Sequence, residues 1–189
     1  MRNHPPKYIF SLVTLLYLLI LPFLSGQVDW AWSVHPEAGF KILTPIPLMY
    51  DVKAVPTDVD VIQFHQYHAG SLSSGPDSMA FVIDHFIVPA QDATMDDEYL
   101  NTFFENTLDE MLVAIDGTLV YMDILHQPGR EVCIWKGSYN GGKGVIRGNI
   151  LLYGDKYYGL QVFGFERKNQ DELMTRFLNS FKRTDEKAN

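Results

Sequence analysis

The stretch "REVCIWKGSYNGGKGVIRGNILLYGDKYYGLQVFGF", residues 130–165, determines the fold that we predict for this chain of 189 residues. It contains three runs with strand character, separated by Asn140-Gly141-Gly142 and by Gly154-Asp155. Asparagine and glycine readily adopt the positive φ angles of tight hairpin turns, and connections this short join antiparallel neighbours. With "TLVYMDILH" (118–126) before the Pro128-Gly129 turn, the stretch predicts a four-stranded antiparallel meander.

The same stretch contains a spacing similar to that of a phosphate-binding loop. Gly137, four residues, and then Gly142 and Lys143 match the beginning of G-x-x-x-x-G-K. Such a loop follows a strand and opens a helix, whose terminal N–H groups meet the phosphates. Here "VIRGNILLY" (145–153) has strand character, and Gly144 stands where a Ser or Thr would bind magnesium. We therefore interpret the segment as a hairpin turn and Ser138 beside it as part of that turn.

Three earlier strands are indicated by alternating apolar residues. In the second of them Ile62 and Phe64 share one face, with His65 on the other. In the third, Asp84 and Phe86 share a face. Flanked by Ile83 and His85, Asp84 would be a half-buried carboxylate, with a cross-strand polar pair as the alternative interpretation. The strands are predicted at 40–43, where Pro45 and Pro47 stop the run, at 59–67 and at 79–88.

Two helices complete the predicted fold. The first has Thr94 as its N-cap and Gly117 as a left-handed closing residue, and its apolar stripe consists of Leu100, Phe104, Leu108, Met111, Leu112 and Ile115. The second begins at Asn169 with Glu172 three residues on, a capping-box pattern. Its core face consists of Leu173, Met174, Phe177, Leu178 and Phe181. The fold class is therefore α+β, an antiparallel sheet flanked by helices in an α/β/α sandwich.

The N-terminal segment differs from the rest of the chain. Arg2 and Lys7 precede a run without charge from Tyr8 to Leu24, and small residues follow. This pattern is typical of a secretory signal peptide, with an uncleaved N-terminal anchor as the alternative. We expect a signal peptide at 1–26, a lead-in segment at 27–38, one domain at 39–183 and a charged tail at 184–189.

Charge and cysteine content exclude some classes of function. The formal net charge is −8, so the chain has no basic surface for a nucleic-acid backbone or an anionic lipid surface. A membrane is expected as a partner only through an uncleaved N-terminal segment. The lone cysteine, Cys133, cannot form an intrachain disulfide, and its place between Val132 and Ile134 favours a small buried side chain over a nucleophile.

The order of elements resembles that of the PsbP/Ran-binding import factor (Mog-type) superfamily. The segments that carry the resemblance are "GFKILTP", "PGREV", "LLYGDKYYGLQVFGF" and "FLNSFK", spread from about Phe40 to Lys182. The resemblance implies an antiparallel sheet between helices and a non-enzymatic role. Characterised relatives bind a membrane photosystem from its lumenal side or bind a small GTPase, and many exported bacterial proteins of this kind have no assigned activity.

Titratable residues do not form a pattern that indicates catalysis. His65 and His68 fall on opposite faces of one strand, and the strongest pairing is His65 with His85 across a hairpin. A catalytic zinc site needs three converging ligands, and with His126 on a later strand we find two at most. We therefore assign no catalytic, cofactor-binding or metal-binding residue and expect no cofactor.

Aromatic residues supply the main binding hypothesis. Adjoining strands carry Trp135, Tyr153, Tyr157, Tyr158, Phe163 and Phe165. On one sheet face these rings would line a cleft for an apolar or sugar-like ligand, or form a protein-binding patch. The interpretation that we favour is that they are core residues and cross-strand pairs.

We expect an exported binding or accessory module of the cell envelope, periplasmic or extracellular, with an unidentified ligand or partner. Two alternatives remain open: an envelope hydrolase or metal-dependent enzyme whose site is assembled only in three dimensions, and a structural envelope component. An enzyme should show a pocket in which titratable groups converge, whereas a binding module should show an apolar or aromatic surface without that convergence.

Overall fold

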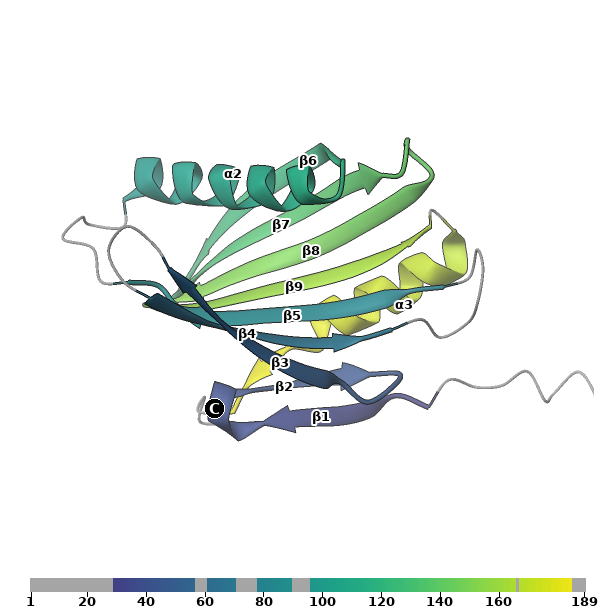
Figure 1. Ribbon diagram of the computed structural model, residues 1–189, viewed down its shortest axis with the longest axis horizontal. Coiled ribbons are helices and arrows are strands. Elements are labelled where there is room, and N and C mark those ends of the chain that lie inside the picture. Colours follow the sequence, from purple (N-terminus) through teal and green to yellow (C-terminus); the bar gives the residue numbers. More distant parts are fainter. Residues whose placement is uncertain (1–28, 57–60, 71–77, 90–95, 166, 185–189) are drawn as a thin grey trace, which may run out of the picture.

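The computed structural model describes residues 29–56, 61–70, 78–89, 96–165 and 167–184 (Figure 1). A seven-stranded antiparallel sheet forms the centre, in the order β3-β4-β5-β9-β8-β7-β6. Its strands are β3 Met49–Pro56, β4 Val61–Ala69, β5 Ala80–Ile87, β6 Thr118–Gln127, β7 Arg130–Tyr139, β8 Gly144–Tyr153 and β9 Lys156–Phe165. A smaller sheet, β1-β2-β10, consists of β1 Ala31–His35, β2 Phe40–Thr44 and β10 Lys182–Arg183, with the short 3-10 helix η2 Pro36–Ala38 between its first two strands.

The predicted C-terminal meander is confirmed. Strands β6 to β9 pair as consecutive antiparallel hairpins. Asn140, Gly141 and Gly142 all have positive φ angles, between 53° and 82°, as a tight hairpin requires. Strand β8 begins at Gly144 directly behind Lys143, so the segment is a hairpin and lacks the helix that a phosphate-binding loop opens. Ser138, expected in the turn, is instead the penultimate residue of β7.

The two faces of the large sheet are covered differently. Helix α2 (Asp97–Ala114) lies over β6 and β7 on one face. On the other face lie helix α3 (Lys168–Asn179) and the small sheet (Figure 1). The predicted α+β class is therefore confirmed, although part of one covering layer is a sheet. Strands β1, β3 and β10 were not predicted. Within the described ranges, no helix is long and apolar enough to cross a membrane.

Both ends of α2 differ from the prediction. The predicted N-cap, Thr94, lies outside the described residues, and Asp96 caps the helix by accepting a hydrogen bond from the N–H of Tyr99 at 2.9 Å. At the other end Asp116, with φ 51°, takes the left-handed conformation that we expected of Gly117. Gly117 is needed for a different reason: a Cβ there would lie 3.0 Å from Leu112 Cδ2 and 3.1 Å from the Ser138 carbonyl oxygen.

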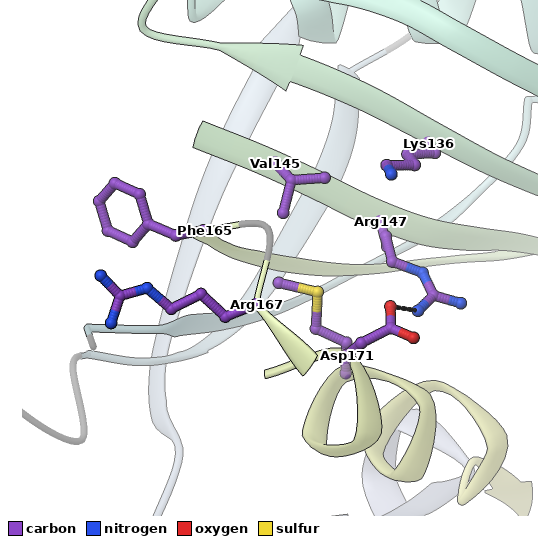
Figure 2. Close-up of a pocket in the computed structure, with 7 residues that line it drawn as sticks. Lys136, Val145, Arg147, Phe165, Arg167 and Asp171 are labelled. Atoms are coloured by element: carbon purple, nitrogen blue, oxygen red, sulfur yellow. Dashed lines mark hydrogen bonds and ion pairs between the residues drawn. The ribbon is translucent and has the colours of Figure 1, made fainter. Parts of the chain in front are cut away.

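Helix α3 is held to the sheet by side chains. It begins at Lys168 with Arg167 as N-cap and no side-chain cap, so the predicted capping box from Asn169 to Glu172 is wrong. Instead Gln170 reaches back to β9, where its Oε1 accepts a hydrogen bond from the N–H of Phe165 at 2.6 Å. Arg147 of β8 forms an ion pair with Asp171 of α3, and Figure 2 shows the two side chains meeting between strand and helix.

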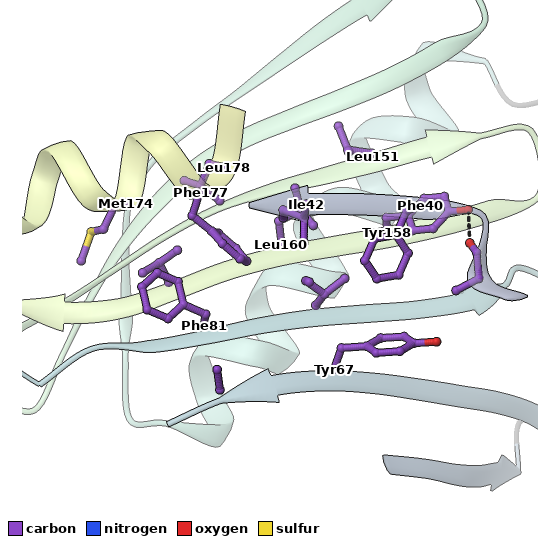
Figure 3. Close-up of a cluster of buried hydrophobic side chains, with 14 of the residues drawn as sticks. Phe40, Ile42, Tyr67, Phe81, Leu151, Tyr158, Leu160, Met174, Phe177 and Leu178 are labelled. Carbon is purple, nitrogen blue, oxygen red and sulfur yellow. Dashed lines mark hydrogen bonds between the residues drawn. The ribbon is translucent and has the colours of Figure 1, made fainter. Parts of the chain in front are cut away.

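The described part of the chain forms two hydrophobic cores, one on each face of the large sheet. Between the sheet, α3 and the small sheet, the core includes Phe40, Ile42, Tyr67, Phe81, Tyr158, Leu160, Met174, Phe177 and Leu178 (Figure 3). The predicted core face of α3 is thus confirmed, with Leu173 and Phe181 partly buried. Tyr158 donates a hydrogen bond to the Ala38 carbonyl at 2.8 Å, which ties the two sheets together.

The second core lies under α2. Leu100, Phe104, Leu108 and Leu112, all from the predicted stripe, pack against Cys133, Trp135, Ile146 and Ile150. Full burial of each such side chain contributes roughly 1.5–3 kcal/mol. Because these partners lie on β7 and β8, the helix is fixed over one half of the sheet.

Candidate functional site

A groove lies beside α2, over the half of the sheet that the helix leaves uncovered. Its volume is about 440 Å³, within the range of ligand sites. Strands β3, β4, β5 and β9 form its floor and α2 forms one wall. It is lined by Val55, Ile62, Phe64, Asp84, Phe86, Val88, Pro89, Phe103, Thr107, Glu110, Met111 and Tyr157. We call it the α2 groove.

Aromatic rings form a continuous part of the lining. On the floor, Phe64 stacks on Phe86, with ring centroids 5.8 Å apart, and Phe86 stacks on Tyr157 at 4.3 Å. Phe103 of α2 meets Tyr157 edge-on at 6.3 Å. The register explains the row, because Phe86 pairs with Tyr157 on the neighbouring strand. Such rings offer apolar area to a ligand.

Asp84 lies among these apolar groups and is 7% exposed. Gln66 of β4 donates a hydrogen bond to its Oδ1 at 2.9 Å, and Gln161 of β9 donates one to its Oδ2 at 2.8 Å. Burial raises the pKa of the Asp84 carboxyl to about 6, against the smaller lowering effect of the two amides. The predicted cross-strand polar pair is therefore present, and the carboxylate is buried more deeply than expected.

A smaller hollow continues from the groove along α2. Its volume is about 190 Å³, and it shares Asp84 and Met111 with the groove. Gln161 and Trp135 also line it. The indole N–H of Trp135 is buried and has no hydrogen-bond partner among the described residues, and it lies over Gly148, where a Cβ would come within 2.5 Å of Nε1. Asp84 thus stands at the junction of two connected hollows.

The charged side chains that line the groove are acidic. Asp84 and Glu110 are both acidic, and the described residues that line the groove include no basic side chain. The groove therefore presents a negative lining to a ligand.

The histidines do not converge on one point. His65 and His85 stack at 5.9 Å, as the predicted pairing implies, on the face opposite to Asp84. The ring of His85 donates a hydrogen bond to the Tyr157 carbonyl at 2.8 Å, and burial lowers its pKa. His126 instead bonds Glu131 at 2.7 Å. In the described part of the chain, no three His, Cys, Asp or Glu side chains lie close enough together to hold a metal ion.

The lone cysteine is a core residue, as predicted. Cys133 is fully buried under α2, and burial, followed by the charge of Asp123, raises the pKa of its thiol to about 12. A thiol of this kind is a poor nucleophile at neutral pH.

The predicted aromatic cleft is divided between the two cores. Burial confirms the core interpretation for Trp135, Tyr153, Tyr157 and Tyr158. Tyr157 alone of the predicted set lines the α2 groove, and sequence reasoning missed the contribution of Phe64, Phe86 and Phe103. The signal that pointed to them was the strand alternation that put Phe64 and Phe86 on defined faces.

A second cleft of about 220 Å³ lies at the start of α3 (Figure 2). Lys136, Arg147 and Arg167 line it together with Asp171. Arg147 is bound to Asp171 and lies 3.3 Å from the Thr175 hydroxyl. The chemistry of this cleft is therefore that of a strand-to-helix tether, and the α2 groove is the better candidate site.

Comparison with solved structures shows that the fold is PsbP-like. The chain is similar to the solution structure of cyanobacterial PsbP (CyanoP) from Synechocystis sp. PCC 6803, with a TM-score of 0.55 and 15% sequence identity. The match covers 85% of this chain and 95% of that one. No family model and no curated protein sequence matches the chain.

Proposed function

We propose that this protein is an exported binding or accessory module of the cell envelope, and that the α2 groove binds a small ligand with an apolar body and a positively charged amine. The observation that carries the proposal is Asp84, a carboxylate buried at the base of a groove with aromatic rings. The PsbP-like fold supports a binding role, and residues 1–26 support export of an envelope protein of this fold.

The proposed amine group of the ligand follows from the absence of a described cationic partner for Asp84. Both described hydrogen bonds to its carboxylate come from neutral amides, so among the described residues no cation is paired with its charge. A buried charge is costly unless it is paired, and an ammonium group would form a charge-assisted hydrogen bond with it. Glu110 at the helix wall adds to the negative field around Asp84. A ligand carboxylate would meet repulsion at the same place.

Three probes with the same aromatic body test the ligand class: naphthylmethylamine, naphthylmethanol and naphthylacetate. Binding to the protein, in the form in which it is recovered from the cell, is measured by titration calorimetry at neutral pH. We expect the amine to bind at least about tenfold more tightly than the alcohol, and the carboxylate most weakly. If none of the three binds, the groove is not a ligand site. If the three bind equally, the role given to Asp84 is wrong.

A matched pair of variants locates the binding site. Thr107 lines the groove, whereas Thr102 is exposed on the same helix, and the hydroxyl of each donates to the carbonyl four residues earlier. Thr107→Trp fills the groove and should abolish binding of the amine, whereas Thr102→Trp should leave it unchanged. Equal binding by both variants would place the ligand elsewhere.

Export has its own test. The expectation is that residues 1–26 are removed on the way to the periplasm or the medium. Intact mass of the protein recovered from the envelope distinguishes cleavage from retention of an N-terminal anchor, and recovery from the cytoplasm would contradict export.

A further inference from the structure

Strand β3 forms one edge of the large sheet and has no described strand on its outer side. It pairs with β4 at eight consecutive positions, from Met49 to Pro56, without a bulge. All eight residues are exposed. Four of them are large apolar side chains, Met49, Tyr50, Val52 and Val55, each between 41% and 58% exposed. A long regular edge with free backbone N–H and C=O groups is able to pair with another strand.

The opposite edge is built differently. Strand β6 has an irregular register between Leu119 and Tyr121, and α2 packs against it. Bulges and covering helices are the usual means of blocking an edge strand. One edge of the sheet is therefore protected and the other is open.

We propose that two copies of this chain associate through β3, antiparallel and centred on Val52, so that the two large sheets continue into one another. In this register the residues from Met49 to Val55 pair over roughly 24 Å. Pro56, which has no N–H to donate, falls outside the paired segment. An association of this kind is two-fold symmetric, and each copy presents the same surface.

Charge and size complementarity select this register. Asp51 lies opposite Lys53 of the second copy, and the two-fold axis produces that ion pair twice. Met49 lies opposite Val55 of the second copy on the same face, so apolar pairs flank the ion pairs. On the other face Tyr50 lies opposite Ala54 of the second copy, a large side chain against a small one. Opposite charges and well-matched apolar pairs across strands are each stabilising.

The neighbouring registers are disfavoured by the same side chains. A slip of two residues one way sets Asp51 against Asp51, and a slip the other way sets Lys53 against Lys53. Like charges directly opposite each other are destabilising. A slip of one residue would move each side chain to the wrong face. Tyr50 is already held in place, since its hydroxyl is hydrogen-bonded to His65 Nδ1 at 2.8 Å and its ring packs on Tyr67 at 5.0 Å.

Charge reversal tests the register directly. Sedimentation velocity of the protein, in the form in which it is recovered from the cell, should show a concentration-dependent dimer. Asp51→Lys and Lys53→Asp each set two like-charged pairs across the axis, and each should raise the dimer dissociation constant by at least about tenfold. The double variant Asp51→Lys/Lys53→Asp recreates both ion pairs with their signs exchanged and should restore the dimer.

Far-UV circular dichroism shows whether each variant remains folded, and both positions are exposed, so folding should be unaffected. Restoration of the dimer in the double variant would show that residues 51 and 53 face each other across the interface, because an interface elsewhere would not regain an ion pair. A chain that remains monomeric at all concentrations overturns the proposal. So does a dimer that neither single substitution weakens, or a β3 edge occupied by a different protein.

Discussion

Replacing Asp84 by asparagine tests the electrostatics of the α2 groove, because this carboxylate lies where its charge is disfavoured. Burial raises its pKa from 3.8 to about 6. Asparagine has nearly the same shape and no charge. The amide of Gln161 can rotate to present its oxygen to the new N–H group, so the hydrogen bond between these positions is kept. The substitution therefore removes the charge with little change in packing.

The size and sign of the effect follow from proton linkage. One pKa unit corresponds to about 1.4 kcal/mol, so a rise from 3.8 to about 6 lowers the stability of the folded chain by about 3 kcal/mol when Asp84 is ionised. Below about pH 3 the carboxyl is protonated in both folded and unfolded chains, and this loss is absent. As the pH rises from about 4 to about 6, the unfolded chain releases this proton while the folded chain retains it, so stability falls, and the loss is complete once the pH has passed the folded pKa. Asparagine has no such loss.

The measurement is the free energy of unfolding of wild type and Asp84→Asn, from urea titrations at a series of pH values. The difference between the two proteins should grow in favour of the variant by about 3 kcal/mol between about pH 3 and about pH 7. The other groups that titrate in this range are the same in both proteins, so their contributions cancel in the difference between the two free energies of unfolding. Asp109→Asn, at an exposed position on α2, serves as control. A difference that stays constant with pH, or that favours wild type more as the pH rises, would refute the reasoning.

Three further substitutions or reactions probe the core under α2. Gly148→Ala places a Cβ 2.5 Å from Trp135 Nε1, and it should lower the free energy of unfolding by about 1–3 kcal/mol in urea titrations. Gly70→Ala is the control: a Cβ at Gly70 has no heavy atom within 4 Å, so this substitution should change the free energy of unfolding by less than about 0.5 kcal/mol. Leu108→Ala removes a fully buried side chain and should cost about 2–5 kcal/mol, measured in the same way. Cys133 should not react with an aromatic disulfide reagent in the folded protein and should react fully in denaturant; rapid reaction of the native chain would contradict its burial.

The elements that sequence predicted well are those whose causes are local. The hairpin between β7 and β8 depends on Asn140, Gly141 and Gly142, three adjacent residues that accept positive φ angles. The stripe on α2 follows from spacing within one helix. The wrong details at helix ends also have a local explanation. Several residues near each end were able to cap, and the geometry selected Asp96 and Asp116.

Long-range pairing accounts for what the sequence did not reveal. Strand β3 has no single buried face, so its pattern lacks the alternation that identifies a strand, and its conformation depends on pairing with β4. Asp84 could be assigned to a sheet face, but its partners Gln66 and Gln161 lie 18 and 77 residues away along the chain. The groove was equally hidden, because the lateral position of α2 is a property of the assembled sheet.

The position of α2 and the presence of the groove have a common cause in the polarity of the sheet. The chain must cross from β5, near the middle, to β6 at the far edge, and α2 is the segment that makes this connection. Its apolar stripe can rest on β7 and β8, where Cys133 and Ile150 are apolar. Over β4, β5 and β9 the same stripe would pack directly on Gln66, Asp84 and Gln161, and leucine and phenylalanine side chains offer no hydrogen bonds to these polar groups. The three side chains are hydrogen-bonded to one another, and only the edge of the helix reaches them, where Met111 lies 3.9 Å from Gln161. We infer that this polar part of the sheet disfavours the apolar stripe of α2, in keeping with the position of the helix to one side of the aromatic floor.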